Sequence, residues 1–150
     1  FRALMKNKNR PQVWKQIFDK ANLLANSGKH HEALDLYEMV VKIDSSHYMT
    51  WNNIGVAKLC LGIYEDSLAD FSRAIELKPE YKDAYHNRGL AYSDLGQLKY
   101  AYEDLSKAID LDPSYWSAYR HRSIINQMLG NHEESYKDFL MSKNLDKRPT

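Results

Sequence analysis

Small and apolar residues recur every three to four positions along most of this chain, which is the pattern of helices with one buried face. A glycine interrupts the pattern at a fixed interval. These glycines lie 34 residues apart, at Gly28, Gly62, Gly96 and Gly130. A periodic segment of about 14 residues lies on each side of every glycine, a layout typical of stacked helical hairpins. The sequence therefore predicts a repeat array.

Two helices are expected in each repeat. Gly96 is expected to end a first helix in the left-handed conformation, and Pro113 follows a second helix, where it stops propagation. The expected helices cover residues 13–27, 29–43, 47–61, 64–77, 81–95, 98–111, 115–129 and 132–145. We expect a single domain over residues 13–147, with repeats at 14–47, 48–81, 82–115 and 116–149.

The third repeat has the most complete set of recurring residues. They are Tyr85, Gly89, Tyr92, Gly96, Ala101, Leu105, Ala108 and Pro113. These residue types at this spacing resemble the tetratricopeptide repeat family, and the resemblance covers nearly the whole chain. It implies an all-α fold, a right-handed α-solenoid of four stacked antiparallel helix pairs, in which the first helix of each pair lines a concave groove.

Composition favours a protein-binding domain over other classes. The 150 residues are 43% hydrophobic, and 21 basic residues oppose 20 acidic ones, so the weak overall field gives no support for nucleic acid or a membrane surface as partner. No apolar run approaches the roughly 20 residues that span a bilayer. The single cysteine, Cys60, fits a reducing compartment, and we expect the cytoplasm.

Residues 1–12 form a basic tail. Arg2, Lys6, Lys8 and Arg10 occur there without an acid. We expect a solvated linker, with a docking or localisation signal as the alternative.

Catalytic motifs are absent from the sequence. It has no glycine-rich phosphate loop, no Cys-x-x-Cys and no His-Glu-x-x-His. His30 and His31 are adjacent on an expected helix, so their side chains diverge by about 100° and cannot share a metal. We expect a non-enzyme with no cofactor and no metal.

The resemblance places a peptide-binding groove on the first helices. The groove positions carry Asn22, Met49, Asn53, Val56, Leu59, His86, Asn87, Leu90, Arg120, His121, Ile124 and Met128. Asn53 and Asn87 are equivalent in successive repeats, and an amide can both donate to and accept from an extended peptide backbone. The alternative is that asparagine is simply common at this position in the family.

An apolar row also crosses the groove at equivalent positions, Val56, Leu90 and Ile124. Apolar side chains aligned on a wet face indicate an interaction site, and burial between curved helices is the alternative. We therefore expect a protein-interaction module of a larger scaffold or adaptor that binds an extended or helical peptide. A structural spacer within a longer solenoid, or the substrate-recruiting arm of an enzyme, are the alternatives.

Some members of the family grip the C-terminal carboxylate of a chaperone tail with converging cations. Here Phe18, Asp83 and Asn87 occupy the cation positions of that clamp. A carboxylate without those cations would be desolvated and unpaired, so we expect a different kind of peptide.

Acidic residues at equivalent positions of the second helices are expected to pair with arginines of the following repeat. This arrangement joins Asp70 to Arg88 and Asp104 to Arg122, and it leaves Asp138 without an arginine. A stranded buried carboxylate is costly. We therefore expect further repeats or self-association at the C-terminal end.

Overall fold

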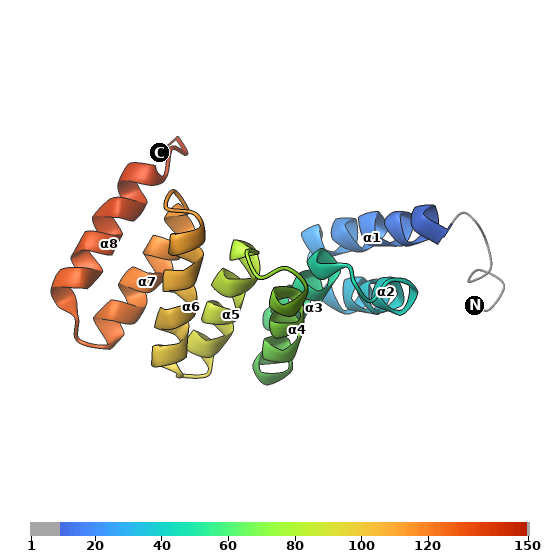
Figure 1. Cartoon of the computed structure of the whole chain (residues 1–150), viewed down its shortest axis with the longest axis horizontal. Helices are drawn as coiled ribbons and strands as arrows, with labels where there is room; N and C mark the ends of the chain where they lie inside the picture. Colours follow the sequence, from blue (N-terminus) through green and yellow to red (C-terminus); the bar gives the residue numbers. More distant parts are fainter. Residues whose placement is uncertain (1–9, 150) are drawn as a thin grey trace. The chain divides into compact units, whose positions relative to one another are not determined.

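The computed structural model describes residues 10–149, which contain eight α-helices and no strand (Figure 1). They are α1 (Arg10–Asn26), α2 (His30–Ile43), α3 (Tyr48–Cys60), α4 (Tyr64–Leu77), α5 (Lys82–Asp94), α6 (Leu98–Leu111), α7 (Trp116–Met128) and α8 (His132–Leu145). Helix α1 begins three residues before the expected start, at Arg10. The first nine residues of the predicted basic tail lie outside the described part of the chain.

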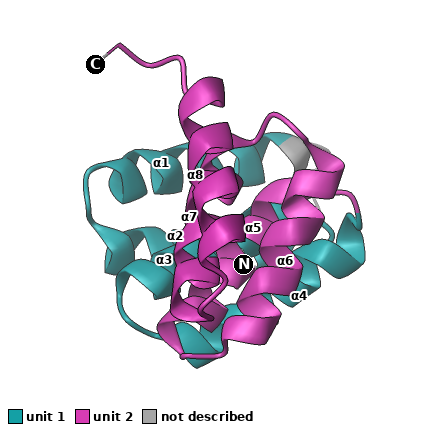
Figure 2. Cartoon of the chain, turned by 90° about the vertical axis from the view of Figure 1, so that its left-hand side faces the viewer, with its two compact units in different colours: residues 1–79 teal, residues 80–150 magenta. Residues whose placement is uncertain are grey.

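The chain divides into two compact units, residues 1–79 and 80–150 (Figure 2). In the first unit α1 packs on α2, α2 on α3 and α3 on α4. In the second unit α5, α6, α7 and α8 repeat this order of neighbours. Each unit is therefore two helical hairpins joined through the second helix of one hairpin and the first helix of the next.

A glycine in the left-handed conformation joins the two helices of every hairpin. Gly96 has φ of 73°, and its N–H donates to the Ser93 carbonyl oxygen at 2.9 Å. The next N–H, from Gln97, donates to the Tyr92 carbonyl oxygen at 2.8 Å. These two bonds form a Schellman motif, which satisfies carbonyls that the end of α5 would otherwise leave unpaired.

Close helix contact within a hairpin depends on a second glycine. A Cβ atom added to Gly55 on α3 would lie 2.5 Å from the ring of Phe71 on α4, which is fully buried. The equivalent Gly89 on α5 faces Leu105 on α6, with 3.0 Å between an added Cβ and the Leu105 Cγ atom. The absence of a side chain on the first helix therefore makes room for the large core residue of the second.

Buried ion pairs lock the two helices of each hairpin from α3 onward, and they correct the predicted pairing. Arg88 donates through Nε and NH2 to the two Asp104 oxygens at 2.7 and 2.8 Å. Arg122 binds Asp138 in the same two-pronged way, with both bonds at 2.8 Å.

The acidic residues thus pair with a cation of their own hairpin, and the predicted pairing with the following repeat is wrong. Antiparallel helices bring residues 16 positions apart face to face. In the hairpin of α3 and α4, Ile54 stands at the arginine position, and Lys58, one turn later, reaches Asp70 at 2.8 Å. Asp138 is paired with Arg122, so it gives no reason to expect a missing partner at the C-terminal end.

Candidate functional site

The predicted asparagines of the first unit form a hydrogen-bonded cluster between α1 and α3. The Asn22 Oδ1 atom accepts from the Tyr37 hydroxyl at 2.6 Å and from Asn53 Nδ2 at 3.1 Å. Asn52 Nδ2 lies 3.4 Å from Asn53 Oδ1. Burial raises the pKa of Tyr37, so the phenol stays protonated and acts as a donor. The Asn22 amide is held in one orientation by these bonds.

A cavity of about 320 Å³ opens beside this cluster. Its walls are mostly small or uncharged side chains from α1, α2 and α3. They are Asn22, Ala25, Asn26, His30, Tyr37, Asn53, Val56 and Ala57. Three residues predicted to bind peptide, Asn22, Asn53 and Val56, therefore meet at one concave site.

The predicted histidines of the second unit touch each other between α5 and α7. His86 Nε2 lies 2.9 Å from His121 Nδ1 and 3.0 Å from the Ser117 hydroxyl. His86 is buried, and burial together with the charge of His121 lowers its pKa to about 4. Burial also lowers the pKa of His121. With both pKa values lowered, both rings are neutral at physiological pH, so one ring donates its N–H and the other accepts.

A tyrosine and a carboxylate lie beside this histidine pair. The Tyr115 ring packs 5.0 Å from the His86 ring between centroids, and its hydroxyl donates to Asp83 at 3.2 Å. Burial, reinforced by the Asp83 charge, raises the pKa of Tyr115. Asp83 therefore has a hydrogen-bonded partner in Tyr115, the residue that precedes α7.

The remaining predicted residues are distributed along the first helices. Asn87 and Leu90 on α5 and Leu59 on α3 are half-buried. Met49 at the start of α3 and Met128 at the end of α7 are exposed.

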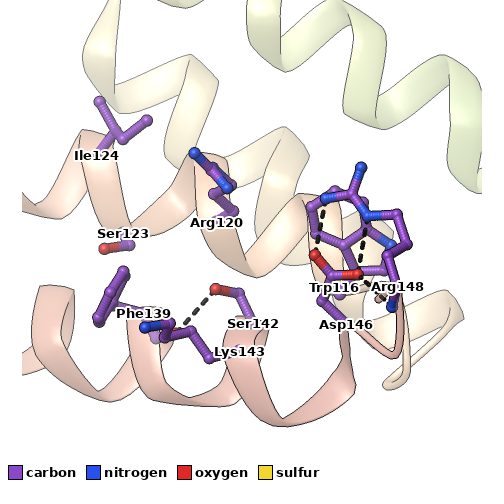
Figure 3. A pocket seen from close by; sticks show the side chains of 9 residues that line it. All are labelled: Trp116, Arg120, Ser123, Ile124, Phe139, Ser142, Lys143, Asp146 and Arg148. Atoms are coloured by element: carbon purple, nitrogen blue, oxygen red, sulfur yellow. Dashed lines mark hydrogen bonds and ion pairs between the residues drawn. The ribbon is translucent and has the colours of Figure 1, made fainter. Parts of the chain in front are cut away.

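Arg120 and Ile124 lie on α7 beside a second hollow, the α7–α8 groove, which has a volume of about 520 Å³ (Figure 3). Its lining residues are Trp116, Arg120, Ser123, Ile124, Phe139, Ser142, Lys143, Asp146 and Arg148. Sequence reasoning did not assign Phe139, Lys143 or Arg148 to a binding site. Phe139 occupies a core position of the repeat pattern, so the sequence predicted that a further helix or a second molecule covers it.

The described residues give no basis for metal binding or membrane insertion. No group of three histidine, cysteine or carboxylate side chains between residues 10 and 149 is arranged to hold a metal ion. Within the same range, none of the helices has the length and apolar character needed to cross a bilayer.

Comparison with known families agrees with this architecture. The tetratricopeptide repeat model matches residues 83–115, and a second TPR repeat model matches residues 59–96. The chain therefore contains tetratricopeptide repeats in residues 59–115. The predicted all-α solenoid class is thereby confirmed, and proteins of this family are generally non-catalytic interaction modules.

Solved structures of similar TPR proteins cover most of the chain. The chain is 26% identical to MamA 41-end from Desulfovibrio magneticus RS-1, with a TM-score of 0.80, over 88% of this chain and 75% of that one. It is 27% identical to the first TPR of Spaghetti (RPAP3) bound to HSP90 peptide SRMEEVD, with a TM-score of 0.77, over 79% of this chain and 94% of that one.

A curated relative matches a shorter part. The Protein STIP1 homolog of Dictyostelium discoideum is 29% identical over 63 residues, which is 42% of this chain and 11% of that protein. The TPR chain thus spans a small fraction of this relative. These similarities support a protein-interaction module.

Proposed function

We propose that this TPR protein is a non-catalytic module, part of a larger scaffold or adaptor, that binds an extended or helical peptide along the inner faces of its first helices. The observation that carries the proposal is the pair Asn22 and Asn53 beside the 320 Å³ cavity of the first unit. An amide fixed at the edge of a cavity can bind peptide backbone without reading its sequence.

The hydrogen bonds of the cluster indicate which amide group of Asn22 can bind a peptide. Both bonds to Asn22 use its oxygen, so its Nδ2 group is the donor that we assign to a peptide carbonyl. Val56 lies on the same cavity wall and supplies an apolar contact for a peptide side chain. The site therefore combines backbone recognition with one apolar subsite.

The partner that we propose is a protein segment other than a chaperone carboxylate tail. Phe18 stands where a tail-binding member has a cation, and it packs against Tyr37 and His47, with ring centroids 6.0 and 5.0 Å apart. A packed aromatic ring cannot neutralise a carboxylate. The near-even balance of charges argues against nucleic acid, and the exposed Cys60 supports a cytoplasmic location.

Peptide-array screening followed by calorimetry with the best peptide tests this function. Asn53→Ala removes the hydrogen bond that orients the Asn22 amide and should weaken peptide binding roughly fivefold, the effect of one hydrogen bond of about 1 kcal/mol. Asn87→Ala, at the equivalent position on α5, should act in the same direction. Gln16→Ala is the matched control, because Gln16 is an exposed amide on α1 outside the cavity walls.

Unchanged affinity in Asn53→Ala and Asn87→Ala would contradict the amide recognition. Tight binding of the peptide SRMEEVD would contradict the exclusion of a carboxylate tail. If no peptide of the array binds, and Asn53→Ala and Asn87→Ala keep every cellular partner, the chain is a structural spacer or a recruiting arm instead.

A further inference from the structure

Phe139 on α8 stands at a position that is buried in every other hairpin. Its equivalents one, two and three repeats earlier are Leu105, Phe71 and Tyr37, with exposed fractions of 0%, 0% and 2%. Phe139 is 44% exposed. A large aromatic ring is therefore half in solvent at a place where the repeat pattern puts core.

The greater exposure of Phe139 follows from the helices that pack on its equivalents in the other hairpins. In the first unit, Ile54 of α3 belongs to the same core cluster as Tyr37. In the second unit, Ile125 of α7 belongs to the same core cluster as Leu105. A helix lying across a hairpin thus covers this side chain. Within residues 10–149 no further helix follows α8 to do so.

The α7–α8 groove beside Phe139 has an apolar end. Ile124 and Phe139 lie at the same end of it, with Ser123 between them, as Figure 3 shows, and Ile124 is 50% exposed. Met128, one turn further along α7, is 57% exposed and continues the apolar strip. This surface is suited to apolar side chains of a partner.

The floor of the groove is formed by two small residues without unsatisfied hydroxyls. Ser123 and Ser142 are buried, with exposed fractions of 8% and 4%. Ser123 donates to the Ser135 carbonyl oxygen and Ser142 to the Phe139 carbonyl oxygen, both at 2.8 Å. A partner backbone can approach this floor closely without stranding a polar group.

The other end of the groove is cationic. Arg120 follows Trp116 on α7 by one turn and precedes Ile124 by one turn, and Lys143 follows Phe139 by one turn on α8. The Lys143 Nζ atom lies 5.2 Å from the Phe139 ring centroid. Among the described residues, neither Arg120 nor Lys143 has a carboxylate within ion-pair distance.

The one acidic residue of the lining, Asp146, is already engaged. Arg148 binds it through Nε and NH2 at 2.9 and 2.7 Å and covers the Trp116 ring at 4.1 Å. The Arg148 guanidinium, with a smaller contribution from the Arg120 charge, lowers the pKa of Asp146, which therefore stays ionised and paired. Arg120 acts on Asp146 beyond ion-pair distance, so the exposed Arg120 and Lys143 can both form an ion pair with a ligand.

We propose that the α7–α8 groove is a second docking site, distinct from the inner-face peptide site, for an acidic amphipathic helix of a partner protein. One turn of a helix advances about 5.4 Å, which is also the step from Ile124 to Arg120 and from Phe139 to Lys143. A partner helix with an apolar side chain and a carboxylate four positions apart can place the apolar group beside Ile124 and Phe139 and the carboxylate beside Arg120 and Lys143. Complementarity of charge selects this occupant over a neutral or basic one.

Fluorescence anisotropy with a labelled helical peptide of about five turns tests the site. The acidic probe carries Leu and Glu at i, i+4 spacing, and a matched basic probe replaces every Glu by Lys. The acidic probe should bind the intact chain, and the basic probe should bind roughly tenfold more weakly. The double variant Arg120→Glu, Lys143→Glu should lose roughly tenfold in affinity for the acidic probe and gain for the basic one.

Two controls separate this site from general charge effects and from the inner face. Lys99→Glu with Lys107→Glu makes the same charge change on exposed positions of α6 and should leave the affinity for the acidic probe unchanged. Asn53→Ala should also leave it unchanged, so failure at one site is distinguishable from failure at the other. Phe139→Ser should abolish probe binding, with circular dichroism to verify folding.

Three results would overturn the proposal. The first is equal affinity for acidic and basic probes. The second is equal loss in the α6 control and the groove variant. The third is a dimer in sedimentation analysis that Phe139→Ser dissociates and the probe does not displace, because the occupant would then be a second copy of the chain.

Discussion

Burial of His86, together with its contact with His121, makes the stability of the second unit depend on pH. The pKa of His86 is lowered to about 4 from an ordinary 6.5, so the unfolded chain takes up a proton before the folded one does as pH falls. The stabilising effect of the neutral pair is complete above about pH 7 and is lost between about pH 6.5 and 4. A shift of this size corresponds to at most about 3 kcal/mol at the acid end.

Urea unfolding at pH 7.5 and at pH 5 measures this dependence. We expect His86→Gln to flatten the decline in unfolding free energy between the two values, because glutamine keeps a hydrogen-bonding group that does not titrate. The exposed His31→Gln in the first unit should retain the full decline. A decline of the same size in His86→Gln and in the unmodified chain would show that other groups cause it.

Single residues also mark the limit of what the sequence could predict. The acidic positions Asp70, Asp104 and Asp138 were recognisable from their spacing, and all are buried. Their partners were assigned wrongly because Lys58 supplies the cation one turn after Ile54, and this shift made the second repeat appear to lack one. A search over neighbouring turns of the same helix face would have found it.

At the scale of the helix pair, Gly55 and Gly89 should differ in how well they tolerate a larger residue. Alanine at Gly55 would bring its Cβ to 2.5 Å from the buried Phe71 ring, whereas alanine at Gly89 would lie 3.0 Å from the Leu105 Cγ atom and 3.3 Å from the Ala101 carbonyl oxygen. Overpacking against a rigid ring costs about 1 to 3 kcal/mol. Alanine regains about 1 kcal/mol of helix propensity at either site.

We therefore expect Gly55→Ala to destabilise the chain by about 1 to 2 kcal/mol and Gly89→Ala to change its stability by less than about 1 kcal/mol. Denaturant unfolding of both variants gives the comparison. Phe71→Leu combined with Gly55→Ala should recover part of the loss, since the smaller side chain leaves room for the methyl group. Equal losses in the two single variants would contradict the packing argument.

Helices were the most predictable level of this structure. The expected ranges for α4, α6 and α8 agree with the observed bounds at both ends. The expected range for α2 differs by one residue at one end, and those for α3, α5 and α7 differ by one residue at each end. The periodic pattern and the glycine caps fix these bounds locally. The start of α1 was missed because Pro11 was read as a boundary, although proline is tolerated in the first turn of a helix.

At the scale of the whole molecule, the two proposed sites should differ in their response to salt. The cavity of the first unit is lined by uncharged side chains and one histidine, and the α7–α8 groove presents Arg120 and Lys143. The Debye length falls from about 10 Å to about 3 Å between 0.1 and 1 M salt. Added salt should therefore weaken the acidic probe severalfold and leave the inner-face peptide nearly unchanged.

Anisotropy and calorimetry over a sodium chloride series measure both affinities on the same protein. A steep salt dependence at the inner face would indicate an acidic or nucleic-acid partner there. If added salt leaves the affinity for the acidic probe unchanged, Arg120 and Lys143 do not contribute to its binding.

The composition of the candidate sites was less predictable than the helices that hold them. Asn22, Asn53 and Val56 were recognised one by one, and their meeting at one cavity depends on how α1 and α3 pack. The α7–α8 groove was not predicted, because exposure of Phe139 depends on the absence of a covering helix among the described residues, and the repeat pattern contains no signal for that.

The ion pairs within the hairpins have a consequence for the order in which the chain gains structure. Arg88 with Asp104 and Arg122 with Asp138 close loops of only 16 residues, and the Schellman turn between their helices is more local still. Loops of this length close in well under a microsecond, far faster than a ribosome adds one amino acid. Each hairpin from α3 onward can therefore form its own ion pair during synthesis, before the next hairpin has been translated.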